Sequence, residues 1–388
     1  MPNTLSEWFC LKPGRHSFKP NVIRDRELVF CHEAKIEDEI MMSIERRFAA
    51  RQPVKMVLYG DWGVGKTHAV YHISWWFDQH AADFPAQTVL VELGDITSKS
   101  RFDVLVGPFL DRIGLPELVR LVHGYTSAAG GKHVVEGLKE RGAASNVAEA
   151  FGKLLLASPG GTPPPAVLTA FEFLKGEKTK DAASMGLGGT LSQSEEFYSV
   201  LLCCGELCQT VNKKQLIFMA DEAAKLEDID ADDATKRHWI AANRLIFDDN
   251  NDAFGFIYTL SGKGQRSVPS VISDPQIVNR LGSNNMIELP NLAPTDVESF
   301  LEKLRVSFVD KACVDGLTGT GTITPSEYDW KRYPFTASGW NEFVGYWNNN
   351  QQDAKPRDIC DKLDDVGFRA MKDNKRLIDP DCLRKARM

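Results

Sequence analysis

The segment YGDWGVGKTH, residues 59–68, combines closely spaced glycines with a lysine and a threonine. It fits the pattern G-x-x-x-x-G-K-T, with Gly60, Gly65, Lys66 and Thr67 in the fixed positions. The backbone N–H groups of such a loop point at phosphate oxygens, and a helix that begins at the lysine adds its N-terminal partial charge. The lysine reaches the β- and γ-phosphates, and the threonine hydroxyl ligates Mg²⁺. The alternative is a glycine-rich turn between a strand and a helix.

We therefore expect this segment, called here the glycine loop (residues 60–68), to bind ATP together with Mg²⁺. The residues expected to contact the nucleotide are Gly60, Asp61, Trp62, Gly63, Val64, Gly65, Lys66, Thr67 and His68, with Thr67 also a metal ligand.

Two adjacent acids end the apolar run QLIFMADE, residues 215–222. Asp221, at the carboxyl end of a strand, can hold Mg²⁺ through water. Glu222 can polarise an attacking water as a general base, which predicts hydrolysis of ATP. A water-activating glutamate would waste ATP in a small-molecule kinase, so the pair argues against that class. The alternative is an ordinary acidic strand end that caps the following helix.

The apolar runs that must position these groups alternate with helical patterns. Strands are expected at residues 55–59, 88–93, 215–222, 253–262 and 285–289. Strands that alternate with helices predict a parallel, doubly wound α/β sheet. A long helical stretch fills residues 98–211, and the chain from residue 289 onward looks mostly helical.

With the glycine loop, the acid pair and the order of the elements in place, residues 25–370 resemble an AAA+ ATPase. The resemblance implies a parallel-sheet P-loop NTPase domain with a long helical insertion, followed by a helical lid domain. We expect an N-terminal arm at 1–28, the ATPase domain at 29–290 with its insertion at about 98–211, and the lid with a second sensor motif and a short basic tail at 291–388.

The same resemblance implies three further catalytic residues. Ser261, or Thr259 in its place, would sense the γ-phosphate from the strand YTLSG. Arg280 would reach a neighbouring copy's nucleotide, with Arg266 the first alternative. In AKPRDICDKL, Pro356 would start a helix and Arg357 would point at the phosphates. The alternatives are a capping hydroxyl, a solvated arginine and a plain first-turn arginine.

Two longer segments resemble narrower groups of this family. RYPFTASGWNEFVGYW is similar to the lid of the initiator-like clade, and AFEFLKGEKTKDAASMGL (170–187) is similar to prokaryotic ATPases of the BREX-type phage-defence group. This implies a nucleotide-driven switch or motor in a prokaryotic DNA transaction, phage defence or DNA modification, with a partner protein and an ATP-dependent homo-oligomer. The alternatives are a regulatory ATP/ADP-binding signalling switch with little turnover and a transposition target-selection ATPase.

Composition limits the partners and the compartment. The net charge of −7 means that any DNA contact must be local or shared with a partner. No signal peptide or membrane-spanning run is present, so we expect no membrane contact. Eight cysteines without paired short spacings predict free thiols in a reducing cytoplasm. Cys203, Cys204 and Cys208 fall on one predicted helix, on which Phe197, Leu201, Cys204 and Cys208 recur at core spacing. This spacing favours packing over a metal site.

Overall fold

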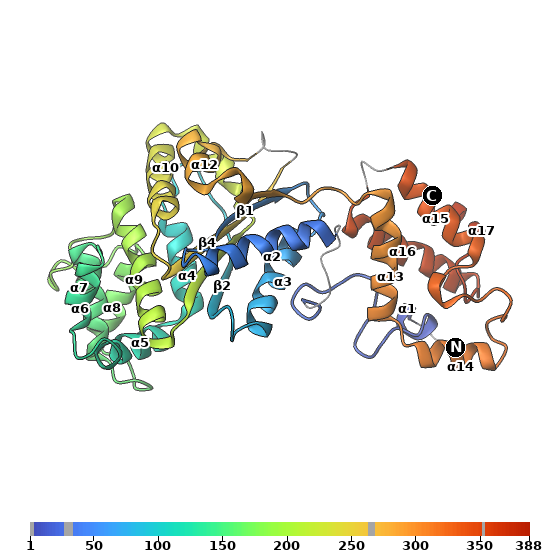
Figure 1. Cartoon of the computed structure of the whole chain (residues 1–388), viewed down its shortest axis with the longest axis horizontal. Coiled ribbons are helices and arrows are strands. Elements are labelled where there is room, and N and C mark those ends of the chain that lie inside the picture. Colours follow the sequence, from blue (N-terminus) through green and yellow to red (C-terminus); the bar gives the residue numbers. More distant parts are fainter. Residues whose placement is uncertain (1–3, 27–33, 263–267, 351–353) are drawn as a thin grey trace. The chain divides into compact units, whose positions relative to one another are not determined.

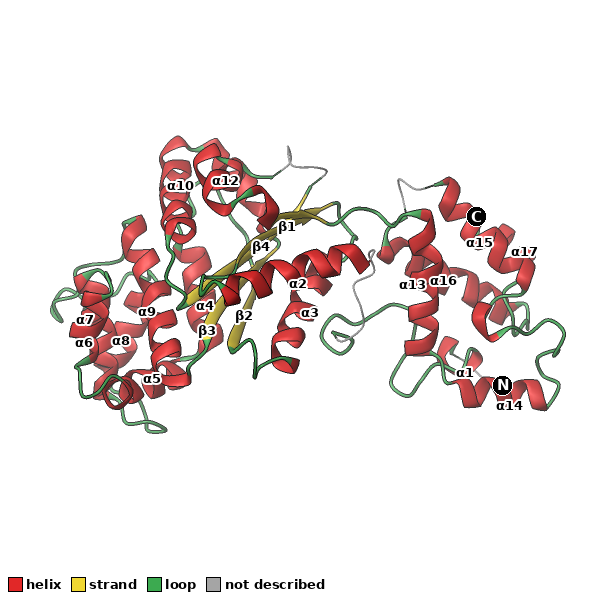
Figure 2. Cartoon of the chain, in the orientation of Figure 1, coloured by secondary structure: helices red, strands yellow, loops and turns green. Residues whose placement is uncertain are grey.

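The computed structural model describes residues 4–26, 34–262, 268–350 and 354–388. The chain divides into two compact units (Figures 1 and 2). The sheet unit comprises Glu39–Gly60 and Ile73–Glu288. The helical unit comprises Met1–Asp38, Asp61–His72 and Leu289–Met388, and therefore includes most of the glycine loop.

The sheet unit is built on five parallel strands in the order β2-β3-β4-β1-β5. β1 and β3 are buried at every position, as expected for strands of a parallel sheet that read as continuous apolar runs. All five predicted strands are confirmed, with ends that shift by one or two residues. The strands are β1 (Lys55–Gly60), β2 (Ala86–Glu92), β3 (Gln215–Asp221), β4 (Phe254–Ser261) and β5 (Met286–Glu288).

Helices fill the chain between β2 and β3, where the long helical stretch was expected, and pack together in Figure 1 beside α9. The core of the sheet unit runs continuously from the sheet into these helices. Cys204 and Cys208 are buried in that core, as their spacing predicted, and so is Cys203. The helices are α4 (Asp103–Ile113), α5 (Leu115–Ala128), α6 (Val134–Glu140), α7 (Ser145–Lys153), α8 (Pro165–Leu174) and α9 (Ser194–Asn212).

The remaining helices of the sheet unit follow β3 and β4. They are α10 (Asp233–Asp248), α11 (Ser270–Ser273) and α12 (Pro275–Leu281). Two helices are divided between the units, α2 (Ala34–Ala49) and α3 (Lys66–Gln79). In each of them the N-terminal residues belong to the helical unit and the C-terminal residues belong to the sheet unit.

The helical unit has a core of its own. The N-terminal segment, which we expected to be an arm, contributes Trp8, Phe9 and Leu11 to this core, because an amphipathic turn there packs against the C-terminal helices. The helices are α1 (Leu5–Trp8), α13 (Pro294–Phe308), α14 (Lys311–Gly319), α15 (Ala337–Asn349), α16 (Pro356–Lys372) and α17 (Pro380–Lys385).

The expectation that the cysteines are free thiols is wrong for two of them, because Cys10 and Cys313 form a disulfide. Leu11 pairs with Val309 in an antiparallel bridge, and the Asp310 N–H donates to the Cys10 carbonyl. These contacts join segments separated by 303 residues, which no local spacing reveals. Cys31 lies outside the described residues. In the part of the chain that is described, no helix is both long and apolar enough to cross a membrane.

Candidate nucleotide-binding site

The glycine loop leaves the carboxyl end of β1 at Gly60 and runs into α3 at Lys66. Gly63 and Gly65 have φ values of +88° and +99°, a region that favours glycine because a Cβ would be strained there. The Ala69 N–H donates to the Gly65 carbonyl at 2.9 Å, so the helix begins directly at the loop. The glycines therefore make the sharp turn that exposes successive backbone amides in front of a helix N-terminus.

Side chains of the loop stabilise this turn. The Lys66 Nζ donates to the Asp61 carbonyl at 2.8 Å, which bends the lysine back across the loop. The Trp62 N–H donates to the Asp61 carboxylate at 2.8 Å. Lys66 and His68 are buried, whereas Thr67 is half-buried. Val64 is fully buried.

The N-terminus of α16 lies against the glycine loop within the helical unit. Pro356 is the first residue of α16, which confirms the predicted helix start. The Arg357 guanidinium lies over the Trp62 indole, 4.0 Å from the ring centroid. The Arg357 N–H donates to the Gly63 carbonyl at 3.4 Å, and the Lys355 ammonium pairs with the Asp61 carboxylate at 2.9 Å. Arg357 is therefore beside the loop that it was expected to serve.

Asp221 and Glu222 lie at the carboxyl edge of the sheet, the edge from which the glycine loop leaves β1. Asp221 is the last residue of β3 and is only 5% exposed. The hydroxyl of Thr259, on the neighbouring strand β4, donates to the Asp221 carboxylate and accepts the Glu222 N–H at 3.3 Å. Thr259 is fully buried, so these hydrogen bonds fix the acid pair from within the sheet.

Glu222 turns away from the strand direction. Its φ of +58° lies in the left-handed region, which is uncommon for a residue other than glycine. Its carboxylate pairs with the Lys225 ammonium at 2.8 Å, and the Lys225 Nζ also donates to the Leu93 carbonyl at 2.7 Å. The hydrogen bond with Glu222 raises the pKa of Lys225. The candidate base is therefore exposed and already bonded to a cation.

The two candidate sensor hydroxyls occupy different places on β4. Ser261 is half-buried at the end of the strand and pairs in register with Gly60, where the glycine loop begins. Thr259 lies two residues earlier and contacts Asp221 instead. Both residues thus lie near the carboxyl edge of the sheet, and each remains a prediction as the γ-phosphate sensor.

Arg280, the candidate for action on a neighbouring copy, lies on α12. Its guanidinium pairs with Asp248 of α10 and donates to the Gln276 carbonyl. The side chain is 30% exposed, so its bonds within the chain are open to competition from solvent. Arg266, the alternative, lies outside the described residues.

Sequence reasoning missed Lys355 and Lys225, the two lysines that pair with Asp61 and Glu222. Lys225 could have been found from its spacing, because residues three apart on a helical turn are neighbours. Lys355 carried a weaker signal, its position just before Pro356 and Arg357.

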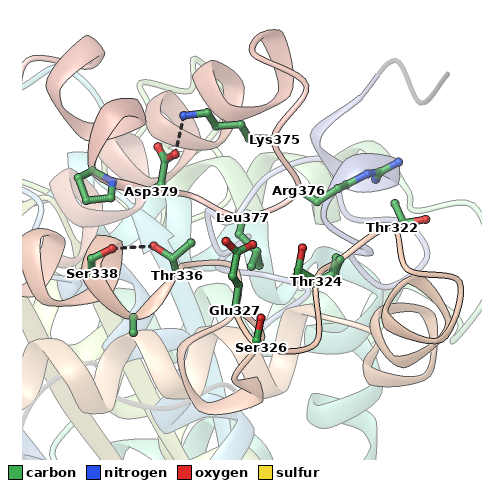
Figure 3. A pocket seen from close by; sticks show the side chains of 13 residues that line it. Thr322, Thr324, Ser326, Glu327, Thr336, Ser338, Lys375, Arg376, Leu377 and Asp379 are labelled. Atoms are coloured by element: carbon green, nitrogen blue, oxygen red, sulfur yellow. Dashed lines mark hydrogen bonds and ion pairs between the residues drawn. The ribbon is translucent and has the colours of Figure 1, made fainter.

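A cavity of about 700 Å³ in the helical unit is a separate feature (Figure 3). Hydroxyl groups such as those of Thr324, Thr336 and Ser338 line it. Its two cations are engaged within the protein, since Lys375 pairs with Asp379 and Arg376 donates to the Trp8 carbonyl at 2.7 Å.

Comparisons with known proteins bear on the fold. No protein-family model matches the sequence, and no curated protein matches it. Among solved structures, the chain is similar to the ORC2 protein of Aeropyrum pernix in ADPNP–ADP complexes, with 12% identity, a TM-score of 0.50, and coverage of 97% of this chain and 72% of that one.

Two further similar structures have TM-scores below 0.5. The ADP form of the same protein has 11% identity and a TM-score of 0.48, with coverage of 98% of this chain and 71% of that one. Cdc6p from Pyrobaculum aerophilum has 10% identity and a TM-score of 0.46, with coverage of 98% of this chain and 70% of that one. The fold assignment rests on the parallel sheet and on the first structure. The chain shares with the ORC2 protein of Aeropyrum pernix an α/β fold built on a parallel sheet, with a helical C-terminal region.

Proposed function

We propose that the chain binds ATP with Mg²⁺ through its glycine loop and hydrolyses it with the help of Asp221 and Glu222. The observation that carries the proposal is the loop itself: Gly63 and Gly65 at positive φ directly before α3, with Lys66 bent across the turn. That geometry presents backbone amides, a helix N-terminus and an ammonium to a phosphate chain.

The residues fit a nucleotide and a hard cation. Thr67 offers a hydroxyl and Asp221 a carboxylate, which are oxygen ligands of the kind that Mg²⁺ prefers. The metal, when bound, neutralises charge on the phosphate oxygens. Lys66 and Arg357 supply positive charge to the phosphates, and Glu222 accepts a proton from the attacking water.

A second candidate is a regulatory ATP/ADP-binding switch with little turnover, and the Glu222–Lys225 ion pair favours it. A carboxylate that is bonded to an ammonium must leave that partner before it can serve as a base. The same site would then hold nucleotide for long periods. The two candidates differ in rate and not in the residues that bind ATP.

The biological setting that we propose is a prokaryotic DNA transaction, preferably phage defence or DNA modification, in which a partner protein supplies other chemistry. Its support is the resemblance of the lid segment and of residues 170–187 to such ATPases, together with the similarity to an ORC2 protein. A transposition target selector would share this ATPase core. The net charge of −7 indicates that DNA contacts would be local.

Steady-state ATP hydrolysis by the full chain, measured with and without single- and double-stranded DNA, tests the proposal. Glu222→Gln keeps the shape of the side chain but cannot accept the proton, so hydrolysis should fall by about 10²–10⁴-fold while ATP still binds. A fall of less than about tenfold would place the base elsewhere. DNA-stimulated turnover supports the motor, whereas tightly retained ADP without stimulation supports the regulatory switch.

A further inference from the structure

Two basic residues at the start of α16 meet the glycine loop in different ways. The Lys355 ammonium pairs with the Asp61 carboxylate at 2.9 Å, so its charge is balanced by the loop. The Arg357 guanidinium instead lies 4.0 Å from the centroid of the Trp62 ring. Among the residues that the structure describes, no carboxylate pairs with Arg357. The arginine is therefore held at the loop without being neutralised.

The start of α16 lies in van der Waals contact with the glycine loop. A Cβ at Gly63 would lie 3.5 Å from the Arg357 Cβ and 3.6 Å from the Lys355 Cδ, so the start of α16 packs directly over the loop. The Trp62 side chain is 62% exposed, which is unusual for so large an apolar group beside a candidate site. Core packing does not account for an indole in this position.

We propose that Trp62 is a positioning residue for Arg357, an inference that rests on the proposed ATP site. A guanidinium that lies over an aromatic face can keep its N–H donors, which lie in its own plane, free to form paired hydrogen bonds to phosphate oxygens. A carboxylate at this position would also hold the arginine but would cancel its charge. The indole orients Arg357 and leaves both its charge and its hydrogen-bonding edge for the terminal phosphate of ATP.

The expected effect is modest because the ring is exposed. An exposed cation–π contact contributes about 0.5–1 kcal/mol, which corresponds to about two- to fivefold in affinity. The loss should be larger for a triphosphate than for ADP, because only the triphosphate presents the group that Arg357 is positioned to meet.

A double-mutant cycle tests this role in the full chain with Mg²⁺, by titration with a non-hydrolysable ATP analogue and with ADP. Trp62→Leu should raise the Kd of the analogue about two- to fivefold and change that of ADP less. Trp62→Tyr, which keeps an aromatic face, should restore most of the affinity. In an Arg357→Ala background, Trp62→Leu should cause no further loss, since the side chain acts through the arginine.

Phe368→Leu is the matched control, because it removes an exposed ring that lies 4.8 Å from the Lys372 ammonium on the same helix. It should leave both affinities unchanged. The same loss from Trp62→Leu with and without Arg357, or equal losses for the analogue and ADP, would overturn the positioning role. A wild-type chain that binds neither nucleotide would instead overturn the proposed ATP site.

Discussion

Replacing Thr259 by valine tests whether buried hydrogen bonds organise the acid pair. Valine has nearly the same shape, so no cavity forms, but the Asp221 carboxylate and the Glu222 N–H each lose a partner. A hydrogen bond to a charged group contributes about 1.5–3 kcal/mol and one between neutral groups about 0.5–1.5 kcal/mol. The hydrogen bond from the Glu222 N–H is long at 3.3 Å, so we take its contribution from the lower end of the range for neutral groups. We expect the free energy of unfolding of the sheet unit to fall by about 2–3 kcal/mol.

Amide hydrogen exchange in peptides from β3 and β4 measures this loss locally. A change of about 2–3 kcal/mol should speed exchange of amides that open with the sheet by about 30- to 150-fold. Ser261→Ala, a half-buried position on the same strand, is the control and should change stability by less than about 0.5 kcal/mol. If Thr259→Val changed exchange no more than Ser261→Ala does, the hydroxyl would not organise the acid pair.

Two other predictions concern assembly and pH. If Arg280 acts on a neighbouring copy, Arg280→Ala should bind ATP but hydrolyse it about 10³–10⁵-fold more slowly. Mixing it with Lys66→Ala should restore part of the activity, and a mixture of folded, assembled chains that stays inactive would rule out this role. Burial raises the pKa of the Asp364 carboxyl from 3.8 to about 6. The native state therefore holds this proton more tightly than the unfolded state does, so the free energy of unfolding falls as pH rises through about 6. Urea denaturation measures the free energy of unfolding of the helical unit, which in Asp364→Asn should no longer decline between about pH 4 and 7. An unchanged decline in this variant would contradict the assignment.

The parts of the fold that the sequence predicted are those set by local patterns. The apolar runs of β1 and β3 indicate buried strands because both faces of a parallel sheet are covered. The glycine spacing predicts the loop, since Gly63 and Gly65 occupy backbone conformations that other residues adopt poorly. Pro356 predicts the start of α16, because its missing N–H costs nothing in the first turn of a helix.

The contacts that escaped prediction join residues far apart in the chain. Cys10 bonds to Cys313 only because the N-terminal segment packs on the C-terminal helices. Because that segment is polar overall, its composition does not indicate that Trp8 and Phe9 are core residues. Stacking of Arg357 on Trp62 depends on how α16 approaches the loop, which neither segment encodes by itself. Such contacts follow from tertiary packing, which the periodicity of a helix or a strand does not predict.

A calorimetric titration of the full chain with ATP and Mg²⁺, run beside Lys66→Ala, tests the central claim most directly. The lysine neutralises phosphate charge that the backbone amides of the loop cannot neutralise alone, so the wild-type chain should bind ATP and the variant should give no measurable binding. The variant must retain the wild-type thermal unfolding profile for the comparison to hold. Wild-type ATP affinity in a folded Lys66→Ala variant would show that the glycine loop does not hold the phosphates.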